Sequence, residues 1–322
     1  MSVHTIIEFS ELEEFLKHYS LGTLKHFEGV YPGVTNTIYA FTTEQGKYIL
    51  TLFEELKYSE LTFYIELINY FADQGLPTPR VIPDRNGTLA GTLKNKPAVA
   101  MEFLLGNMIE HASKEQCYAI GKALGELHSV GRLFPQKPVT TKGSQWREQS
   151  AEKLYPVLSS EDAALLRSEI AFHKMHAFTL ISDPNTHHKN ILSDLTMPQG
   201  IIHADLFREN VLFTGNQLTG LLDFYYACYD YLLYDLAVVI NDWCIHEDFS
   251  LDKEKIHEVI RGYETYRILT DEEKKHFNTM LRLAALRFWL SRLLDFHFTP
   301  KKPNIKSKDP NEFKMILLKH IQ

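Results

Sequence analysis

The sequence predicts an α+β fold in two lobes, an N-terminal lobe built on an antiparallel sheet and a mainly helical C-terminal lobe. Its 322 residues are too many for one small domain and suit two lobes of roughly 100–200 residues each. Up to about residue 103, alternating apolar and polar stretches end at glycines, as antiparallel strands do. From residue 104 onward, capping motifs introduce helical apolar stripes instead. We therefore predict two domains, residues 1–103 and 104–322.

The N-terminal lobe is expected to begin with a helix and to continue as a sheet. Ser10 and Glu13 have the spacing of a capping box, and apolar residues follow on one helical face. The segments LKHFEGV, TNTIYAFTT and KYILTLF then predict a meander of strands. A helix over SELTFYIELINYFADQ and two further strands, around Gly91 to Leu93 and over PAVAMEF, complete the lobe.

Helices dominate the predicted C-terminal lobe. The segment SKEQCYAIGKALGELH opens with a capping box, and its Gly121 and Gly125 have the spacing for close packing against another helix. A second box, at Thr270 and Glu273, begins a long helix with a buried pattern. Only residues 200–225 interrupt this series, with short apolar strands that flank polar residues.

The composition indicates a soluble cytoplasmic protein that does not bind nucleic acid. A net charge of −7 and the lack of a long basic run argue against a phosphate backbone as partner. The cysteines Cys117, Cys228 and Cys244 are far apart and form no CxxC pair, which fits a reducing compartment. The sequence has no run of about 18 apolar residues and no signal-peptide pattern at its N-terminus.

One polar cluster breaks the apolar strands of IIHADLFRENVLF, residues 201–213. Asp205 and Asn210 lie in it, and Asp223 follows 18 residues after Asp205 (223 − 205). A strand-turn-strand excursion between them would gather three oxygen ligands, the donors that Mg²⁺ prefers together with substrate phosphates. A carboxylate free of the metal can accept a proton from a hydroxyl during phosphoryl transfer. A single Asp after a strand is usually a turn residue, so the combination, with His203, is what indicates catalysis.

The pattern H-x-D-x-x-x-x-N followed by Asp-Phe resembles the catalytic loop and metal-binding Asp of the protein-kinase-like fold. With Ala after the His and DLAVVINDW downstream, the chain is similar to the aminoglycoside phosphotransferase and choline kinase family. Within that family, PQGIIHADLFRENVLF, LRFWLSRLLD and the tail KDPNEFKMILLKHIQ resemble the bacterial homoserine kinases. The resemblance covers nearly the whole chain and is weakest over residues 132–197.

The resemblance implies roles for the polar cluster. Asp205 would be the catalytic base that receives the hydroxyl proton, and Asn210 and Asp223 would hold Mg²⁺ on the phosphates of ATP. His203 would brace the loop through hydrogen bonds. The nucleotide would contact a glycine-containing loop and the segment that links the lobes, through Gly33, Asn36, Met101, Glu102 and Phe103.

Three other buried-pattern residues are expected to have structural roles. We expect Asp230 and Asp235 to stabilise the segment after Asp223 rather than to touch substrate. His128 ends a helix on its apolar side, where a core histidine with satisfied hydrogen bonds is the better interpretation.

The acceptor implied by the resemblance is L-homoserine, which carries a carboxylate and an ammonium. Arginine holds a carboxylate best, so Arg208 in the loop and Arg287 and Arg292 on the LRFWLSR helix are candidates. Asp242 is a candidate for the ammonium. An exposed loop charge, structural ion pairs and a helix cap explain these residues equally well.

One departure from the kinase fold supports an alternative. Thr51 occupies the third-strand position where the fold usually has Lys or Arg, although the homoserine kinases also have T-L-F-E there. Lys47 is a candidate for the missing cation, and a solvated lysine at a strand end is the simpler interpretation. The alternatives are a kinase of another hydroxyl, such as an aminoglycoside or choline, and a catalytically silent kinase-like binding protein. The intact Asp205, Asn210 and Asp223 argue against the silent protein.

Overall fold

The computed structural model describes residues 5–30, 36–176, 197–299 and 308–322. The chain divides into two compact units. The first contains the described residues up to Gly106 together with Thr219–Leu222, and the second contains the described residues of the remainder. Strands dominate the first unit and helices the second, so the predicted α+β class is confirmed. The domain boundary between residues 103 and 104 stays a prediction.

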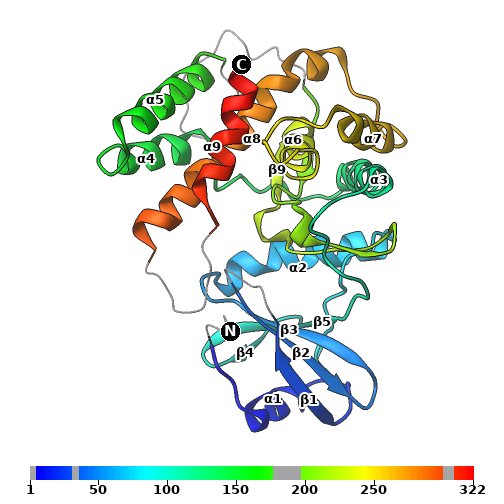
Figure 1. The fold of residues 1–322 in the computed structure, drawn as a ribbon. Helices are drawn as coiled ribbons and strands as arrows, with labels where there is room; N and C mark the ends of the chain where they lie inside the picture. The colour runs from blue at the N-terminus through cyan, green and yellow to red at the C-terminus, as the bar shows by residue number, and fades with distance from the viewer. Residues whose placement is uncertain (1–4, 31–35, 177–196, 300–307) are drawn as a thin grey trace. The chain divides into compact units, whose positions relative to one another are not determined.

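A five-stranded antiparallel sheet organises the first unit (Figure 1). Its strand order is β1-β2-β3-β5-β4, so the meander from β1 to β3 is followed by a hairpin that adds β5 next to β3. The strands are β1 (Leu24–Gly29), β2 (Thr37–Thr43), β3 (Lys47–Leu52), β4 (Gly91–Leu93) and β5 (Lys96–Glu102). The helix α2 (Tyr58–Asp73) follows β3 along the chain.

The helix α1 (Phe9–Leu16) packs on this sheet through its apolar side. The capping box predicted at Ser10 and Glu13 is wrong, because the helix starts earlier, with Glu8 as N-cap and Glu11 as its reciprocal partner. Glu is not a preferred N-cap residue, so the pattern favoured the nearby serine. The core shared by α1 and the sheet includes Leu12, Phe15, Leu16, Tyr39, Phe41, Leu50, Leu52, Ala98 and Ala100.

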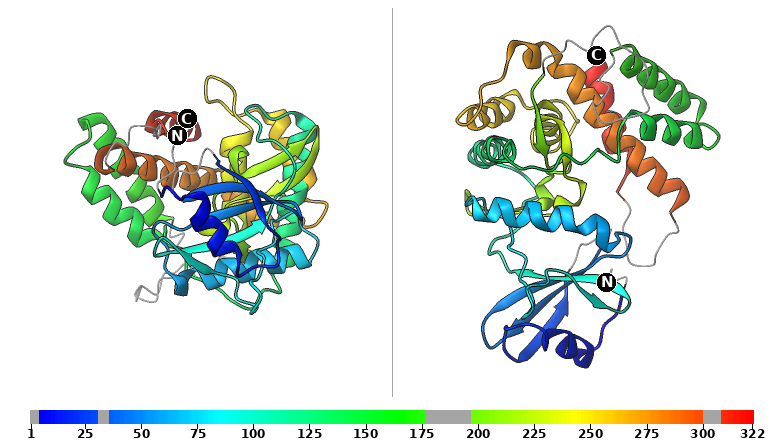
Figure 2. Two further views of the ribbon diagram at one scale, coloured as in Figure 1. Left: turned by 90° about the horizontal axis from the view of Figure 1, so that it is seen from below. Right: turned by 180° about the vertical axis from the view of Figure 1, so that it is seen from behind.

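Helices make up most of the second unit (Figure 2). The capping boxes predicted for α3 and α8 are both present. The long helix α8 contacts α9, α6 and α4. Within the described residues, no helix is both long and apolar enough to cross a membrane. The helices are α3 (Lys114–Gly131), α4 (Ser144–Leu154), α5 (Ser160–Met175), α6 (Leu232–Trp243), α7 (Lys253–Tyr263), α8 (Asp271–Phe298) and α9 (Pro310–Ile321).

Short strands interrupt the helices where the sequence predicts them. The strands β6 and β9 pair antiparallel, and β7 pairs with β8. A 3-10 turn precedes β7 and another precedes β9. These elements are β6 (Gln199–Ile202), η1 (Arg208–Asn210), β7 (Val211–Thr214), β8 (Gln217–Leu221), η2 (Phe224–Tyr226) and β9 (Cys228–Tyr231).

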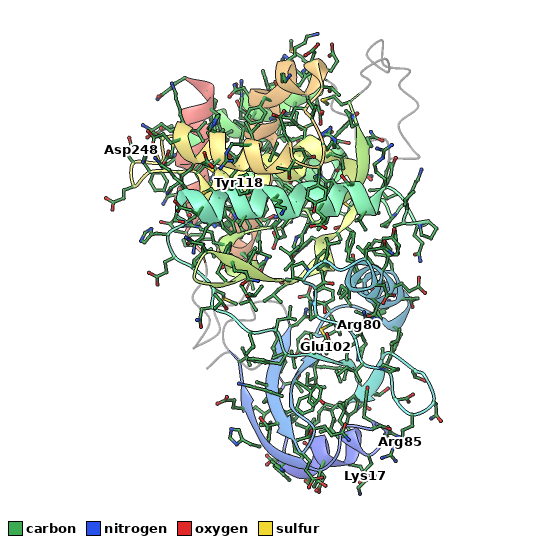
Figure 3. All side chains as sticks on the ribbon, turned by 90° about the vertical axis from the view of Figure 1, so that its right-hand side faces the viewer. Lys17, Arg80, Arg85, Glu102, Tyr118 and Asp248 are labelled. Atoms are coloured by element: carbon green, nitrogen blue, oxygen red, sulfur yellow. The ribbon has the colours of Figure 1, made fainter. Side chains whose placement is uncertain are left out.

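Glycines allow α3 and α7 to approach each other closely, as the spacing of Gly121 and Gly125 predicts. A Cβ atom at Gly121 would lie 2.0 Å from the carbonyl oxygen of Val259 on α7. In the opposite direction, a Cβ atom at Gly262 would lie 2.1 Å from the carbonyl oxygen of Tyr118, which Figure 3 labels on α3. The two backbones are therefore in contact with no room for a methyl group.

Replacing Gly121 by Ala is expected to lower the free energy of unfolding by roughly 1–3 kcal/mol, because the helices must move apart. The higher helix propensity of Ala, worth about 1 kcal/mol, acts in the opposite direction and does not remove the clash. Urea denaturation measures the change. Lys122→Ala is the matched control, since Lys122 is exposed on the same helix; equal stability of the two variants would contradict the close packing.

Candidate active site

The loop between β6 and β7 presents Asp205 through a strained backbone turn. Ala204 has a φ of +64°, which residues other than glycine rarely adopt. The backbone N–H groups of His203 and Ala204 donate hydrogen bonds to the two carboxylate oxygens of Asp235 on α6, at 2.7 and 2.8 Å. Such a conformation persists only where the surroundings hold it. Asp235 therefore fixes the turn directly before Asp205. The prediction that Asp235 is structural is confirmed, although the segment it holds precedes Asp205 instead of following Asp223.

A buried hydrogen-bond network holds Asp235 in turn. His128 Nε2 lies 3.1 Å from Asp235 Oδ2, and His128 Nδ1 lies 2.7 Å from the Tyr263 hydroxyl. Burial lowers the pKa of His128, so the neutral imidazole donates to Asp235 and accepts from Tyr263. Burial alone would raise the pKa of Asp235, but the hydrogen bonds from the His128 ring and the His203 backbone outweigh it and hold this pKa below its usual value. The prediction that His128 is a satisfied core histidine is confirmed.

His203 lies inside the loop as a brace. Its side chain is fully buried, and its Nδ1 accepts the backbone N–H of Asp205 at 3.3 Å. Its ring also packs on Phe224, with the ring centroids 4.5 Å apart. These contacts agree with the bracing role implied by the sequence.

Asn210 is joined directly to Asp205. Its amide nitrogen Nδ2 donates to the Asp205 backbone oxygen at 2.7 Å and lies 3.3 Å from the carboxylate oxygen Oδ2. Because the nitrogen makes these bonds, the carbonyl oxygen Oδ1 of Asn210 is the atom available to a cation.

Asp223 provides a second carboxylate near Asp205. Its backbone has a φ of +61°. Crowding by protein atoms and the negative charge of Asp205 raise the pKa of Asp223 to about 7. The residue is nevertheless exposed, so its desolvation is incomplete, and the repulsion from Asp205 is the effect that a bound cation would relieve.

These donors fit Mg²⁺ only if substrate phosphates complete its coordination. Across residues 5–30, 36–176, 197–299 and 308–322, no group of three or more His, Cys, Asp or Glu side chains could hold a metal ion alone. Mg²⁺ commonly binds through one or two carboxylates plus substrate phosphates and water. An amide oxygen from Asn210 and a carboxylate from Asp223 match that mode of binding.

Arg287 of α8 contacts Asp205, whereas the other predicted substrate residues pair elsewhere in the protein. Arg287 Nη1 lies 3.4 Å from Asp205 Oδ1. Arg208 and Asp242 instead pair with each other, at 3.1 Å between Arg208 Nε and Asp242 Oδ2. Arg292 forms an ion pair with Glu312 of α9. The structure thus gives Arg208, Asp242 and Arg292 partners within the protein, and their substrate roles stay predictions.

Those predicted nucleotide contacts that the structure describes lie in the first unit. Gly33 lies outside the described residues, and Asn36 is buried directly before β2. Met101 and Glu102 end β5. The Glu102 N–H donates to the Arg80 carbonyl at 2.9 Å, and Figure 3 labels Arg80 and Glu102. The Lys47 ammonium lies over the Phe103 ring, 4.3 Å from its centroid. None of these contacts tests a nucleotide role.

Sequence reasoning missed a cavity beside the loop. It is lined by residues from α4, α6, α8, β9 and the segment before α4, and Ala204 places it next to Asp205. Arg147, Lys142 and Tyr226 are among the lining residues with no earlier assignment. The sequence did not indicate a binding role for Arg147 and Lys142, because both lie where the family resemblance is weakest. An arginine on a helix also has many ordinary structural explanations.

Comparisons with known proteins agree on one family. The family model described as "Phosphotransferase enzyme family" matches residues 26–269. The chain is 38% identical to a homoserine kinase of Methylobacillus flagellatus, over 98% of this chain and 94% of the relative. It is 39% identical to a homoserine kinase of Neisseria meningitidis serogroup B, over 99% of each.

Solved structures show the same fold at low sequence identity. An amicoumacin kinase matches with a TM-score of 0.71 and 16% identity, over 98% of this chain and 92% of that one. A spectinomycin phosphotransferase matches with a TM-score of 0.68 and 16% identity, over 97% and 94%. The protein-kinase-like fold class predicted from the catalytic-loop pattern is therefore confirmed.

Proposed function

Because the chain belongs to the phosphotransferase enzyme family, we propose that it is a homoserine kinase. It transfers the γ-phosphoryl group of ATP to the hydroxyl of L-homoserine and releases ADP and O-phospho-L-homoserine. The observation that carries this proposal is the cluster of Asp205, Asn210 and Asp223 at a turn that Asp235 holds. The full-length relatives named homoserine kinase support the choice of acceptor.

Catalysis in this proposal is mainly positioning and charge stabilisation. The Asp205 carboxylate orients the acceptor hydroxyl and takes its proton. Asn210 and Asp223 would hold Mg²⁺, which would supply positive charge to offset that of the ATP phosphates. Gly33, Asn36 and the segment Met101–Phe103 are proposed to contact the nucleotide, with adenine at the end of β5. The expected compartment is the cytoplasm, in agreement with three free and buried cysteines.

A kinase of another hydroxyl is the second candidate, because two solved structures with this fold are an amicoumacin kinase and a spectinomycin phosphotransferase. Those structures share 16% identity with the chain, whereas the relatives named homoserine kinase share 38–39%. The closer similarity favours homoserine.

A panel of acceptors distinguishes the two candidates. The purified protein is given ATP, Mg²⁺ and one acceptor at a time, namely L-homoserine, choline, spectinomycin or kanamycin, and ADP release is measured with a coupled assay. We expect L-homoserine to give the highest kcat/KM. Turnover of choline or an aminoglycoside without turnover of L-homoserine would overturn the proposal.

A further inference from the structure

The cavity beside Asp205 has a charge pattern that fits an amino acid. It is partly open to solvent. Its charged lining residues are Lys142, Arg147, Asp230 and Arg287. Three cations and one acid suit a ligand that carries a carboxylate, and the single acid offers a place for an ammonium.

Arg147 of α4 is the cation of this set that is least engaged by the protein. Its side chain is buried, with 5% of the residue exposed. Within the described residues, its hydrogen bond is a long one, 3.5 Å from Nη1 to the Lys142 carbonyl oxygen, and no carboxylate lies within 4.0 Å of it. A buried guanidinium without an anion is costly. A ligand carboxylate in the cavity would supply the missing partner.

The other two cations are already occupied. Arg287 pairs with Asp205 at 3.4 Å and stacks on the Phe288 ring at 3.9 Å. The Lys142 ammonium lies over the Trp146 ring, 4.5 Å from its centroid. Arg147 is therefore better placed than either residue to bind the ligand, and Arg287 connects the cavity to Asp205.

Asp230 of β9 is the acid of the set, although the sequence pattern favoured a structural role for it. It is buried, with 5% of the residue exposed, and its Oδ1 accepts the backbone N–H of Tyr231 at 2.6 Å. Burial raises the pKa of Asp230 to about 7, because the hydrogen bond and the more distant Arg147 compensate only part of the desolvation. An ammonium bound in the cavity would stabilise the charged carboxylate.

We propose that this cavity is the subsite for the amino-acid end of the acceptor, in which Arg147 binds the α-carboxylate and Asp230 binds the α-ammonium. The acceptor hydroxyl then lies at Asp205, which adjoins the cavity through Ala204 and Arg287. This inference rests on the proposed function and extends it, since it states how an amino acid is distinguished from other alcohols. A site built to bind a charged group rejects analogues that lack it far more strongly than an apolar pocket does.

The test compares acceptors that each lack one charged group. The acceptor 3-aminopropan-1-ol is homoserine without its carboxylate, and 4-hydroxybutanoate is homoserine without its ammonium. We expect Arg147→Met to lower kcat/KM for L-homoserine roughly 10- to 100-fold, mainly through KM, while kcat/KM for 3-aminopropan-1-ol is largely unchanged. Asp230→Asn should lower kcat/KM for L-homoserine and leave that for 4-hydroxybutanoate largely unchanged.

Arg167→Met is the matched control, because Arg167 is an exposed arginine on the neighbouring helix α5. It should keep the acceptor preference of the wild type. An equal fall with both acceptors in Arg147→Met, or no fall with L-homoserine, would overturn the role of Arg147. If Arg147→Met does not fold, Arg147→Lys decides: a smaller but still homoserine-selective loss supports the subsite, and a uniform loss overturns it.

The wild type separates the two proposals before any variant is made. If it turns over 3-aminopropan-1-ol but not L-homoserine, the assignment as a homoserine kinase fails, and the subsite fails with it. If it turns over both acceptors with equal kcat/KM, the carboxylate is not recognised and the subsite alone fails. If it prefers L-homoserine and Arg147→Met keeps that preference, only the subsite is wrong.

Discussion

Asp205→Asn is expected to lower kcat for L-homoserine about 100- to 10,000-fold, the contribution of a positioned general base. Asn has nearly the same shape as Asp but cannot accept the hydroxyl proton. The proposed metal donors on Asn210 and Asp223 remain, so the affinity for ATP with Mg²⁺ should change little. Steady-state kinetics gives kcat, and thermal stabilisation by ATP with Mg²⁺ reports nucleotide binding.

Two results would contradict this account of Asp205. Near-normal turnover in Asp205→Asn would remove its role as the base. Loss of nucleotide binding and activity together would instead indicate that Asp205 holds the nucleotide or the fold. Urea denaturation of the same variant separates the latter two, since Asp205 also pairs with Arg287.

Asp235→Asn is expected to reduce both stability and turnover. The Asp235 carboxylate accepts hydrogen bonds from two backbone N–H groups and from the ring N–H of His128. An Asn amide has one acceptor oxygen, and its NH₂ group would face a donor. Each buried donor left unsatisfied costs roughly 1–3 kcal/mol. The free energy of unfolding should fall by at least that amount, and kcat should fall because the turn at Ala204 loses its support.

Asp271→Asn is the control for this substitution. Asp271 is fully exposed in the first turn of α8, 3.8 Å from Lys274, and such pairs contribute little. Stability and turnover should match the wild type. If Asp235→Asn behaved like this control in urea denaturation and in kinetics, the claim that Asp235 holds the loop would be wrong.

The sequence predicts those features that depend on neighbours along the chain. Local sequence patterns predict several features that the structure contains. They are two capping boxes, the strands around residues 200–225 and the close packing at Gly121 and Gly125. The box at Ser10 failed because an atypical cap, Glu8, begins the helix instead. Local sequence patterns thus predict where a helix or strand lies better than they predict its first residue.

Contacts between distant parts of the chain could not be predicted in the same way. His128 and Asp235 are joined by a hydrogen bond although 107 residues separate them. Arg208 and Asp242 pair across 34 residues, which a sequence pattern cannot distinguish from a free arginine. Arg147 meets Asp230 in one cavity only because α4 and β9 come together. Charge partners of this kind follow from tertiary packing rather than from spacing.

The reaction product tests the central claim most directly. The protein is incubated with L-homoserine, ATP and Mg²⁺, and the products are followed by ³¹P NMR. We predict a phosphomonoester signal of O-phospho-L-homoserine that grows in equal amount with ADP. Formation of ADP with inorganic phosphate alone, or no turnover with L-homoserine, would contradict the proposal.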